Sequence, residues 1–524
     1  MADFGFVGTS YTAPSIYQDD QECINFFAEI DPTKLPGERG IVALYPTPGL
    51  LLQTQLTNAE VRGLHTMSGQ QILIAVAGNI VYQVNLSMVA TQIGTLTTTT
   101  GQVVISDNIT NADGLIAYIV DGPNRYTWVV ATNTFATLPS TDGPWQGADV
   151  VDVIDNYNIY NEPNSQNWAC TDLSSQYSTQ ALYGTSDGSS DLLVTLIADR
   201  RQVYLLGETT TEVWTDVGNV IAGITTFPFQ RVPGTFSQTG CGAKYSLARF
   251  ADSFVIVAKD TRGNSTIEMM QGYAWVKIST HAVEQSLLNQ VVSDAVAYTY
   301  QIEGHEMYVV TFPSVGEYGL TWVYDLSTKS WHKWLSWDSN LAIYKRHRSN
   351  CGAYFANMYI VGDYENGKLY SLENELYTDN GATIRRLRRA KHITTDLQRQ
   401  YFEEFQIQFQ PGVGLTGVAS NLLFGHLLLE NGYALLAENG DYIELNEVYT
   451  QGADPQAMLR WSNDGGSTWS NEHWVSIGRI GQYLNRAIWR RLGWSRDRIF
   501  EVVLTDPIKA VIVSANLKSS VGDN

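Results

Sequence analysis

The chain has 524 residues, of which 44% are hydrophobic and only 16% are charged, and its formal net charge is −20. This composition excludes a disordered chain, which would combine low hydrophobicity with high charge. The excess of acids argues against a protein that covers phosphates, because affinity for DNA comes from lysine and arginine side chains that release counterions. A folded protein with a sizeable core is expected, as one large β unit or several domains.

The first residues, Met-Ala-Asp-Phe-Gly-Phe, have no basic start and no apolar stretch, so we expect no signal peptide. The longest apolar runs, such as residues 254–258, are far shorter than the about 20 residues that a membrane helix needs. The cysteines lie far apart and have neither metal-site nor disulfide-framework spacing. They are Cys23, Cys170, Cys241 and Cys351. We therefore expect synthesis in a cytoplasm, reduced cysteines and no membrane segment.

From about residue 40, short β-rich runs alternate with polar turns. Residues 71–77 end at Gly78-Asn79 and residues 80–84 begin the next run, which is typical of a hairpin. Similar pairs follow within residues 115–130, 192–206, 252–278, 306–325 and 358–372. They recur at roughly forty to sixty residues, as expected of propeller blades. We predict an N-terminal arm at residues 1–39 and a β-propeller at 40–390; a β-sandwich of ordinary hairpins is the alternative.

The character of the sequence changes near residue 385, where a basic stretch (385–392) precedes strict alternation of apolar and polar residues at 402–409. We place a domain boundary there and predict a β-sandwich-like C-terminal domain at residues 391–524. An insertion at about 421–446 repeats Glu-Asn-Gly, and Asn-Gly favours type I′ turns. It is predicted as a hairpin repeat, with a low-complexity loop as the alternative. Helical periodicity is limited to about residues 282–292, so the predicted fold class is all-β.

One motif is typical of enzymes: residues 462–469 match the aspartate box S-x-D-x-G-x-T-W of sialidases. Its expected role is a structural turn, in which Asp464 accepts backbone N–H bonds, Gly466 takes an unusual φ and Trp469 packs underneath. A sialidase would repeat the box and add a set of catalytic residues. We therefore predict no catalytic residue, no metal ligand and no cofactor, and retain a glycan-binding or glycan-cleaving propeller as the alternative function.

Charge is unevenly distributed along the chain. Residues 141–230 contain twelve acids and two bases, Arg200 and Arg201, whereas basic residues gather at 385–392 and in arginines between 479 and 498. An acidic half and a basic end are expected for head-to-tail or ring contacts between copies. Two solvated faces of opposite charge are the alternative interpretation.

Several motifs in chain order carry a family resemblance. They are residues 161–168 with Thr171-Asp-Leu173, the pair 200–207 and 211–214, Gly240-Cys-Gly242, and the closing set Ser462 to Gly466, Arg490-Arg-Leu-Gly493 and Thr505-Asp-Pro507. Together they resemble the packaged-DNA stabilisation proteins, also called tail accessory, tail hub or nozzle proteins, of short-tailed bacteriophages (podoviruses). The motifs are short but span most of the chain, and the insertion at about 421–446 departs from the pattern.

This resemblance implies a structural virion protein, made in the host cytoplasm, that is not an enzyme. It implies a homohexameric ring joined to the portal through an adaptor (head-to-tail connector) protein. The ring would contact tail fibres or tailspikes and a distal needle or plug, retain packaged DNA, and pass genomic DNA during ejection without sequence-specific binding. An acidic conduit fits this role, because a basic lining would hold the phosphates.

The same resemblance suggests roles for two groups of charged residues. We predict that Asp149, Asp152 and Asp155 face the DNA lumen, where they would repel the duplex within a Debye length of about 8 Å. We predict that Arg385, Arg386, Arg388 and Arg389 form an assembly interface, because they stand out in an otherwise acidic chain.

Overall fold

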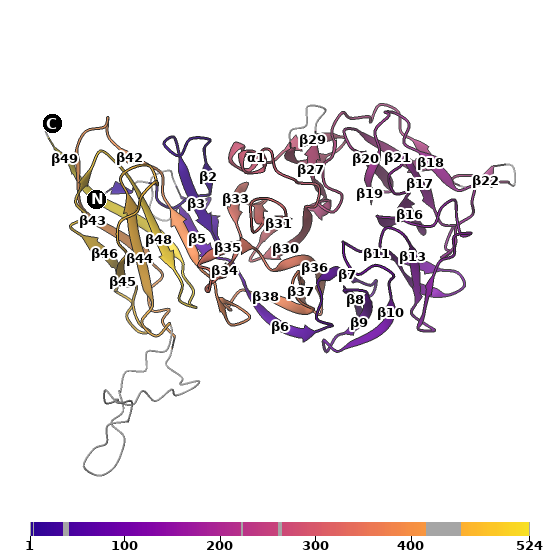
Figure 1. The fold of residues 1–524 in the computed structure, drawn as a ribbon, viewed down its shortest axis with the longest axis horizontal. Helices are drawn as coiled ribbons and strands as arrows, with labels where there is room; N and C mark the ends of the chain where they lie inside the picture. The colour runs from indigo at the N-terminus through magenta and orange to yellow at the C-terminus, as the bar shows by residue number, and fades with distance from the viewer. Residues whose placement is uncertain are drawn as a thin grey trace, which may run out of the picture. The chain divides into compact units, whose positions relative to one another are not determined.

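The computed structural model describes residues 2–3, 5–34, 41–218, 220–221, 224–259, 265–415 and 452–522. It divides into two compact units, one formed by Pro48–Asn374 and the other by Met1–Thr47 together with Glu375–Asn524. Strands make up almost all of the regular structure, and the described residues contain one helix, α1 (His281–Leu287) (Figure 1). This confirms the predicted all-β class. The hairpin repeat predicted at about 421–446 lies outside the described residues.

The unit Pro48–Asn374 is a propeller with seven blades in its described part, each an antiparallel sheet. Blade one contains β7 (Val61–Thr66), β8 (Ile72–Ala77), β9 (Ile80–Asn85) and β10 (Ala90–Thr95). Blade two contains β11 (Val104–Thr110), β12 (Gly114–Val120), β13 (Arg125–Val129) and β14 (Thr134–Thr137). Blade three contains β15 (Val151–Ile154), β16 (Tyr157–Asn161), β17 (Asn167–Cys170) and β18 (Tyr183–Thr185). Blade four contains β19 (Leu193–Asp199), β20 (Gln202–Gly207), β21 (Thr211–Asp216) and β24 (Phe229–Arg231).

The remaining blades follow the same plan. Blade five contains β25 (Gly240–Cys241), β26 (Ala248–Phe250), β27 (Ser253–Lys259), β28 (Ser265–Gln271) and β29 (Ala274–Lys277). Blade six contains β30 (Val296–Ile302), β31 (His305–Phe312), β32 (Leu320–Asp325) and β33 (Ser330–Lys333). Blade seven contains β36 (Ser349–Phe355), β37 (Met358–Asp363), β38 (Lys368–Glu373) and β6 (Gly49–Gln55). Two small hairpins, β22 (Val220–Ile221) with β23 (Ile224–Thr225) and β34 (Leu335–Asp338) with β35 (Ile343–Arg346), add to these blades.

Blade seven closes the ring with strands from both ends of the unit. β6 begins the unit and pairs antiparallel with β38 at its end, from Gly49↔Glu373 to Gln55↔Lys368. The first strands of most successive blades contact one another, as β7 does β11, β11 does β15 and β15 does β19, and β36 of blade seven contacts β7 of blade one. Pairing of β6 with β38 therefore joins the two ends of the unit within one blade.

The middle strands of the blades are largely buried, because neighbouring blades cover both of their faces. In β8 the residues from Leu73 to Ala77 are all buried, so the strand is a continuous apolar run with no alternation. Aromatic side chains of the last two strands pack against each other within the blades. Tyr126 stacks on Phe135 with ring centroids 5.6 Å apart, and Tyr324 lies 5.1 Å from Trp331.

The other unit is a sandwich of two sheets. One sheet orders β4 (Phe26–Ile30), β5 (Val42–Pro46), β49 (Ile512–Val521), β43 (Gln400–Phe409) and β46 (Ala487–Arg490), with β1 (Ala2–Asp3) on β49 and β47 (Trp494–Ser495) on β43. The other orders β3 (Asp20–Ile24), β41 (Arg386–Arg389), β48 (Asp497–Leu504), β44 (Gln456–Ser462) and β45 (His473–Ser476), with β2 (Tyr11–Thr12) on β3 and β42 (Ile393–Thr394) on β48. A short pair, β39 (Thr378–Asp379) and β40 (Ala382–Thr383), precedes β41. Phe405 and Phe500 stack between the two sheets at 4.9 Å.

The observed division of the chain differs from the predicted one at both boundaries. Residues 1–39 do not form a separate arm, because β3 pairs with β41 and β4 pairs with β5 inside the sandwich unit. Burial explains this placement, because Phe26 of the N-terminal segment is fully buried in the same sandwich core as Phe405. The sandwich unit resumes at Glu375, ahead of the predicted boundary at 390/391.

Candidate functional sites: the propeller axis and the buried arginines

The first strands of six blades, together with residues 244–249 of blade five, surround a cavity of about 280 Å³ on the propeller axis. The charged side chains that line it are Arg62, Asp152, Lys244 and Arg249. The remaining lining is largely backbone and apolar side chains, so these charges dominate the local electrostatics.

The three acids predicted to face a DNA lumen lie in blade three or directly before it, and each has a basic partner. Burial raises the pKa of Asp152, and Arg249 counteracts that rise. Asp152 also accepts the backbone N–H of Ala198 at 2.8 Å. The acid–base distances are 2.5 Å for Asp149–Lys244, 2.8 Å for Asp152–Arg249 and 3.1 Å for Asp155–Arg201. The local negative charge is therefore smaller than the count of acids in the sequence suggests.

Two fully buried arginines join neighbouring blades, and neither was singled out in the sequence. Arg62 of β7 donates to the backbone carbonyls of Thr98 at 2.8 Å and Thr100 at 2.7 Å, which precede blade two. The Arg125 guanidinium, on β13, lies 4.4 Å from the centre of the Tyr160 ring of blade three. It also forms an ion pair with the Asp142 carboxylate at 3.2 Å. Such side chains satisfy loop carbonyls that would otherwise be buried without donors. The signal available in the sequence is an arginine within an otherwise apolar strand.

The basic stretch at 385–389 is structural. Arg386 and Arg388 of β41 are fully buried, whereas Arg385, directly before the strand, is half-buried. Arg388 donates to the carbonyls of Phe6 at 2.6 Å and Thr9 at 2.9 Å. Burial lowers the pKa of Arg386 to about 10. An assembly interface of accessible side chains, as we predicted, does not fit Arg386 and Arg388, because the N-terminal segment covers Arg388 and the sandwich encloses both.

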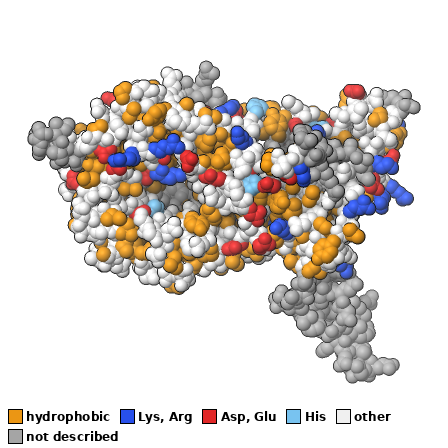
Figure 2. All heavy atoms as spheres, turned by 180° about the vertical axis from the view of Figure 1, so that it is seen from behind, with side chains coloured by type: hydrophobic (Ala, Val, Ile, Leu, Met, Phe, Trp, Pro, Cys, Tyr) orange, Lys and Arg blue, Asp and Glu red, His pale blue; other side chains and the backbone are white. Residues whose placement is uncertain are grey.

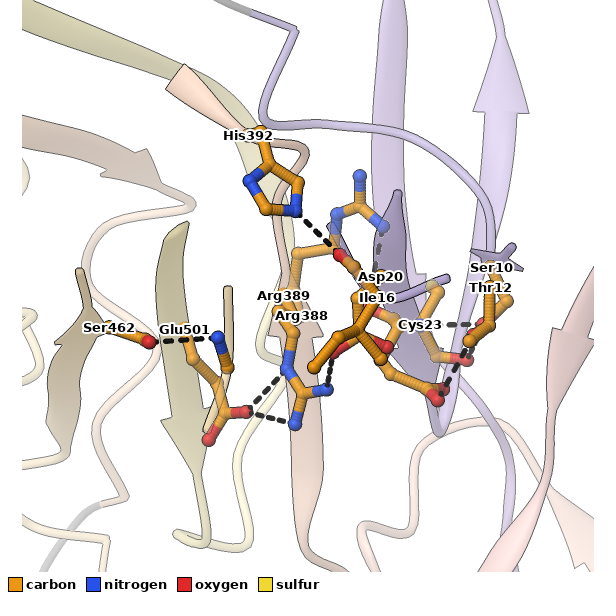
Figure 3. Close-up of polar contacts among 12 residues, drawn as sticks. Ser10, Thr12, Ile16, Asp20, Cys23, Arg388, Arg389, His392, Ser462 and Glu501 are labelled. Atoms are coloured by element: carbon orange, nitrogen blue, oxygen red, sulfur yellow. Dashed lines mark hydrogen bonds and ion pairs between the residues drawn. The ribbon is translucent and has the colours of Figure 1, made fainter. Parts of the chain in front are cut away.

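Arg389 belongs to a compact ion-pair cluster that Figure 3 shows beside Asp20 and Glu501. Its guanidinium donates twice to Glu501, at 2.9 and 2.8 Å, and Arg460 donates to the other oxygen of that fully buried carboxylate at 2.6 Å. Both guanidinium groups lie over the ring of Trp469, at 4.9 and 4.7 Å. Charge-assisted hydrogen bonds from two arginines to the two oxygens of one carboxylate, with cation–π contacts to one ring, link β41, β44 and β48.

Trp469 connects this cluster to the aspartate box. Asp464 accepts the backbone N–H of Thr468 at 2.8 Å and its hydroxyl at 2.6 Å, and Ser462 donates to Asp464 at 2.7 Å. These hydrogen bonds lower the pKa of Asp464 to about 2. Gly466 has a φ of 97°, which favours glycine. The box thus lies in the turn between β44 and β45 and places Trp469 between two arginines.

Two further findings bear on function. In the described ranges, no group of three or more histidine, cysteine, aspartate or glutamate residues could hold a metal ion. No helix among those residues is long and apolar enough to cross a membrane.

Comparison with known proteins identifies the family. The family model described as "Bacteriophage P22 Gp10, beta-propeller" matches residues 17–377, and the model "Bacteriophage P22 Gp10, beta-sandwich" matches residues 426–520. No curated protein matches the chain. Among solved structures, a chain of "Crystal Structure of Mitotic Checkpoint Complex" has a TM-score of 0.37 and 12% identity and covers 66% of this chain and 97% of that chain, a likeness too low to carry a conclusion. Because the propeller model spans more than half of the sequence, this protein belongs to the bacteriophage stabilisation family typified by P22 Gp10 and is a structural protein of a phage tail.

Proposed function

We propose that this protein forms the hexameric nozzle of a short-tailed phage, below the portal and its adaptor, where it retains packaged DNA and conducts it during ejection. The observation that carries the proposal is the match of both halves of the chain to the P22 stabilisation family, in the order propeller then sandwich. The proposed partners are the adaptor protein, tail fibres or tailspikes, and a needle or plug. The virion is the proposed location of the mature protein.

The arrangement of the charges supports passage of DNA without tight binding of its phosphates by lysine and arginine side chains. Among the arginines at 385–389 that could have bound phosphates, Arg386 and Arg388 are buried and Arg389 pairs with Asp20 and Glu501. On the face seen in Figure 2, basic side chains of the propeller lie beside acidic ones instead of forming a continuous basic band. With a net charge of −20, the protein offers little of the phosphate attraction that would stall a sliding duplex.

Retention must then come from steric closure, because repulsion cannot hold DNA. We propose that a distal plug supplies this closure and that the nozzle supplies its seat. We further propose that the protein has no enzymatic activity, because its single aspartate box is a turn that supports a structural cluster. A glycan-cleaving propeller would instead show hydrolase activity as an isolated protein.

The proposal is tested with phage particles assembled without this protein. We expect such particles to fill with DNA and then lose it, and addition of the purified protein to restore retention. A nuclease-protection assay of packaged DNA measures both steps, and a parallel hydrolase assay on bacterial polysaccharide should show no turnover. Particles that keep their DNA without the protein would refute the retention role.

A further inference from the structure

A surface cavity of about 780 Å³ lies between blades six and seven of the propeller. Two adjacent tyrosines form its aromatic wall. Tyr354 is 42% exposed, and its ring centroid lies 4.9 Å from that of Tyr359. The Tyr359 ring in turn meets the buried Tyr300 edge-on at 6.2 Å. One ring is therefore accessible, and the other two hold it in place.

Two tight turns border this cavity. Glu303-Gly304 connects β30 to β31 with φ values of 46° and 89°, and Ala356-Asn357 connects β36 to β37 with φ values of 50° and 61°. Two consecutive residues with positive φ are typical of type I′ hairpins, which are short and stiff. The walls of the cavity are thus preformed, which reduces the entropy lost when a ligand binds.

The cavity is negatively charged. Glu303 and Glu306 line it, and none of its lining residues is a lysine, arginine or histidine. Carboxylates beside exposed tyrosine rings favour a ligand that combines a cation with apolar groups. The same charges disfavour phosphates, so the cavity does not fit passing DNA.

A loop of the sandwich unit has the complementary chemistry. We call residues 478–486, between β45 and β46, the Leu484 loop. Leu484 is 95% exposed, Tyr483 is 67% exposed and Ile480 is 51% exposed. Arg486 is also exposed and makes no ion pair with any residue that the structure describes. Apolar side chains this exposed within five residues indicate a contact surface.

The Leu484 loop holds its own shape through local hydrogen bonds. The Asn485 side chain donates to the Ser476 carbonyl at 3.0 Å, and the Arg479 backbone N–H donates to the Gln482 side chain at 3.0 Å. Gly478 and Gly481 have φ values of 113° and 83°, which let the loop turn sharply. The exposed apolar side chains are therefore presented by a defined loop.

We infer that the Leu484 loop of one copy docks in the tyrosine cavity of a second copy. In this contact Leu484 and Tyr483 cover the exposed ring of Tyr354, and Arg486 pairs with Glu303. The two surfaces differ, so the contact is heterologous, and a heterologous contact generates a ring when the rotation between copies closes. The inference rests on the proposed ring and names the surfaces that build it.

Charge reversal tests the pairing with the full-length protein. We expect Arg486→Glu and Glu303→Arg each to weaken self-association by roughly tenfold or more, because each places like charges together in the contact. Combining Arg486→Glu with Glu303→Arg should restore assembly, since the attraction is regained with opposite polarity. Analytical ultracentrifugation over a concentration series gives the association constants.

Matched controls separate this contact from general charge effects. Arg491→Glu changes an exposed arginine five positions away, and Glu317→Lys changes an exposed acid on the same propeller; both should assemble like the wild type. A second measurement mixes Glu303→Cys and Arg486→Cys proteins, which should form a disulfide-linked dimer under mild oxidation.

The outcomes distinguish the inference from the proposed function. Wild-type rings that tolerate Arg486→Glu and Glu303→Arg, with no rescue and no crosslink, would overturn the docking contact and leave the nozzle proposal intact. A wild-type protein that stays monomeric at all concentrations and in assembled tails would overturn both.

Discussion

Two histidines illustrate how individual side chains of blade six and the segment after it respond to burial. His347 is fully buried, stacks on Trp334 at 3.8 Å and hydrogen-bonds Ser349 at 2.7 Å. Burial, together with the charge of Arg348, lowers the pKa of His347 to about 3. Burial likewise lowers the pKa of His332 to about 4, with Asp325 opposing and His305 reinforcing the shift. Both side chains are neutral packing residues at neutral pH.

These lowered pKa values predict that the free energy of unfolding decreases as the pH is lowered. In the unfolded chain a histidine has a pKa near about 6.5, so below that pH the unfolded state takes up protons that the folded state refuses. The free energy of unfolding should decrease from about pH 6.5 downward, by at most about 1.4 kcal/mol per pH unit for each histidine. Urea titrations of wild type and His347→Gln at pH 7.5 and 5 measure this. An identical pH dependence in both proteins would contradict the assignment.

The aspartate-box turn gives a second prediction at this scale. Asp464 has a lowered pKa, so its contribution to stability is present above the unfolded value of about 3.9 and is lost as pH falls toward 2. Asp464→Ala should lower the melting temperature at pH 7, because the Thr468 donors lose their acceptor. Thr468→Val, which removes the hydroxyl donor alone, should have a smaller effect. Equal melting temperatures for Asp464→Ala and wild type would show that the turn is unimportant for stability.

At the scale of elements, β41 shows what the sequence could not reveal. Its basic residues suggested an accessible interface, but Arg388 donates to carbonyls of Phe6 and Thr9, at the opposite end of the chain. A pattern of charges does not disclose a partner so distant in sequence. Hairpins such as β8–β9 were predictable because their apolar runs and turn residues are adjacent in the chain.

Removal of the Arg388 guanidinium should destabilise the sandwich. Arg388→Met leaves several buried acceptors without donors, and we expect a loss of roughly 2–5 kcal/mol in the free energy of unfolding. Arg491→Met, at an exposed position of the same unit, should change it by less than about 0.5 kcal/mol. Chemical denaturation of the two variants compares them, and equal stabilities would refute the structural role of Arg388.

At the scale of the whole molecule, the sequence predicted an all-β propeller followed by a β-sandwich, and the structure and family models confirm both. Blade number was not predictable, because β6 completes blade seven from the other end of the propeller sequence. The N-terminal strands were misplaced for the same reason: β3 finds its partner in β41, on the far side of the propeller in sequence. Closure and swapped strands depend on long-range pairing, which local periodicity does not encode.

The proposed conduit predicts a salt-dependent effect on DNA ejection. Combining Asp149→Asn, Asp152→Asn and Asp155→Asn frees Lys244, Arg249 and Arg201 from their partners with little change in side-chain size. If these residues face the DNA path, ejection should slow at low salt and recover at high salt, as phosphate contacts are screened. Asp187→Asn, Glu208→Gln and Glu317→Gln together form a control at exposed acids. A normal ejection rate at every salt concentration would remove the three acids from the lumen.

The most direct measurement is electron microscopy of purified tails with this protein labelled by an antibody fragment. The account predicts six copies in a ring directly below the portal adaptor, each with a seven-bladed propeller and a β-sandwich that match this structure. Localisation of the protein outside that ring, or a ring of different symmetry, would contradict the nozzle assignment.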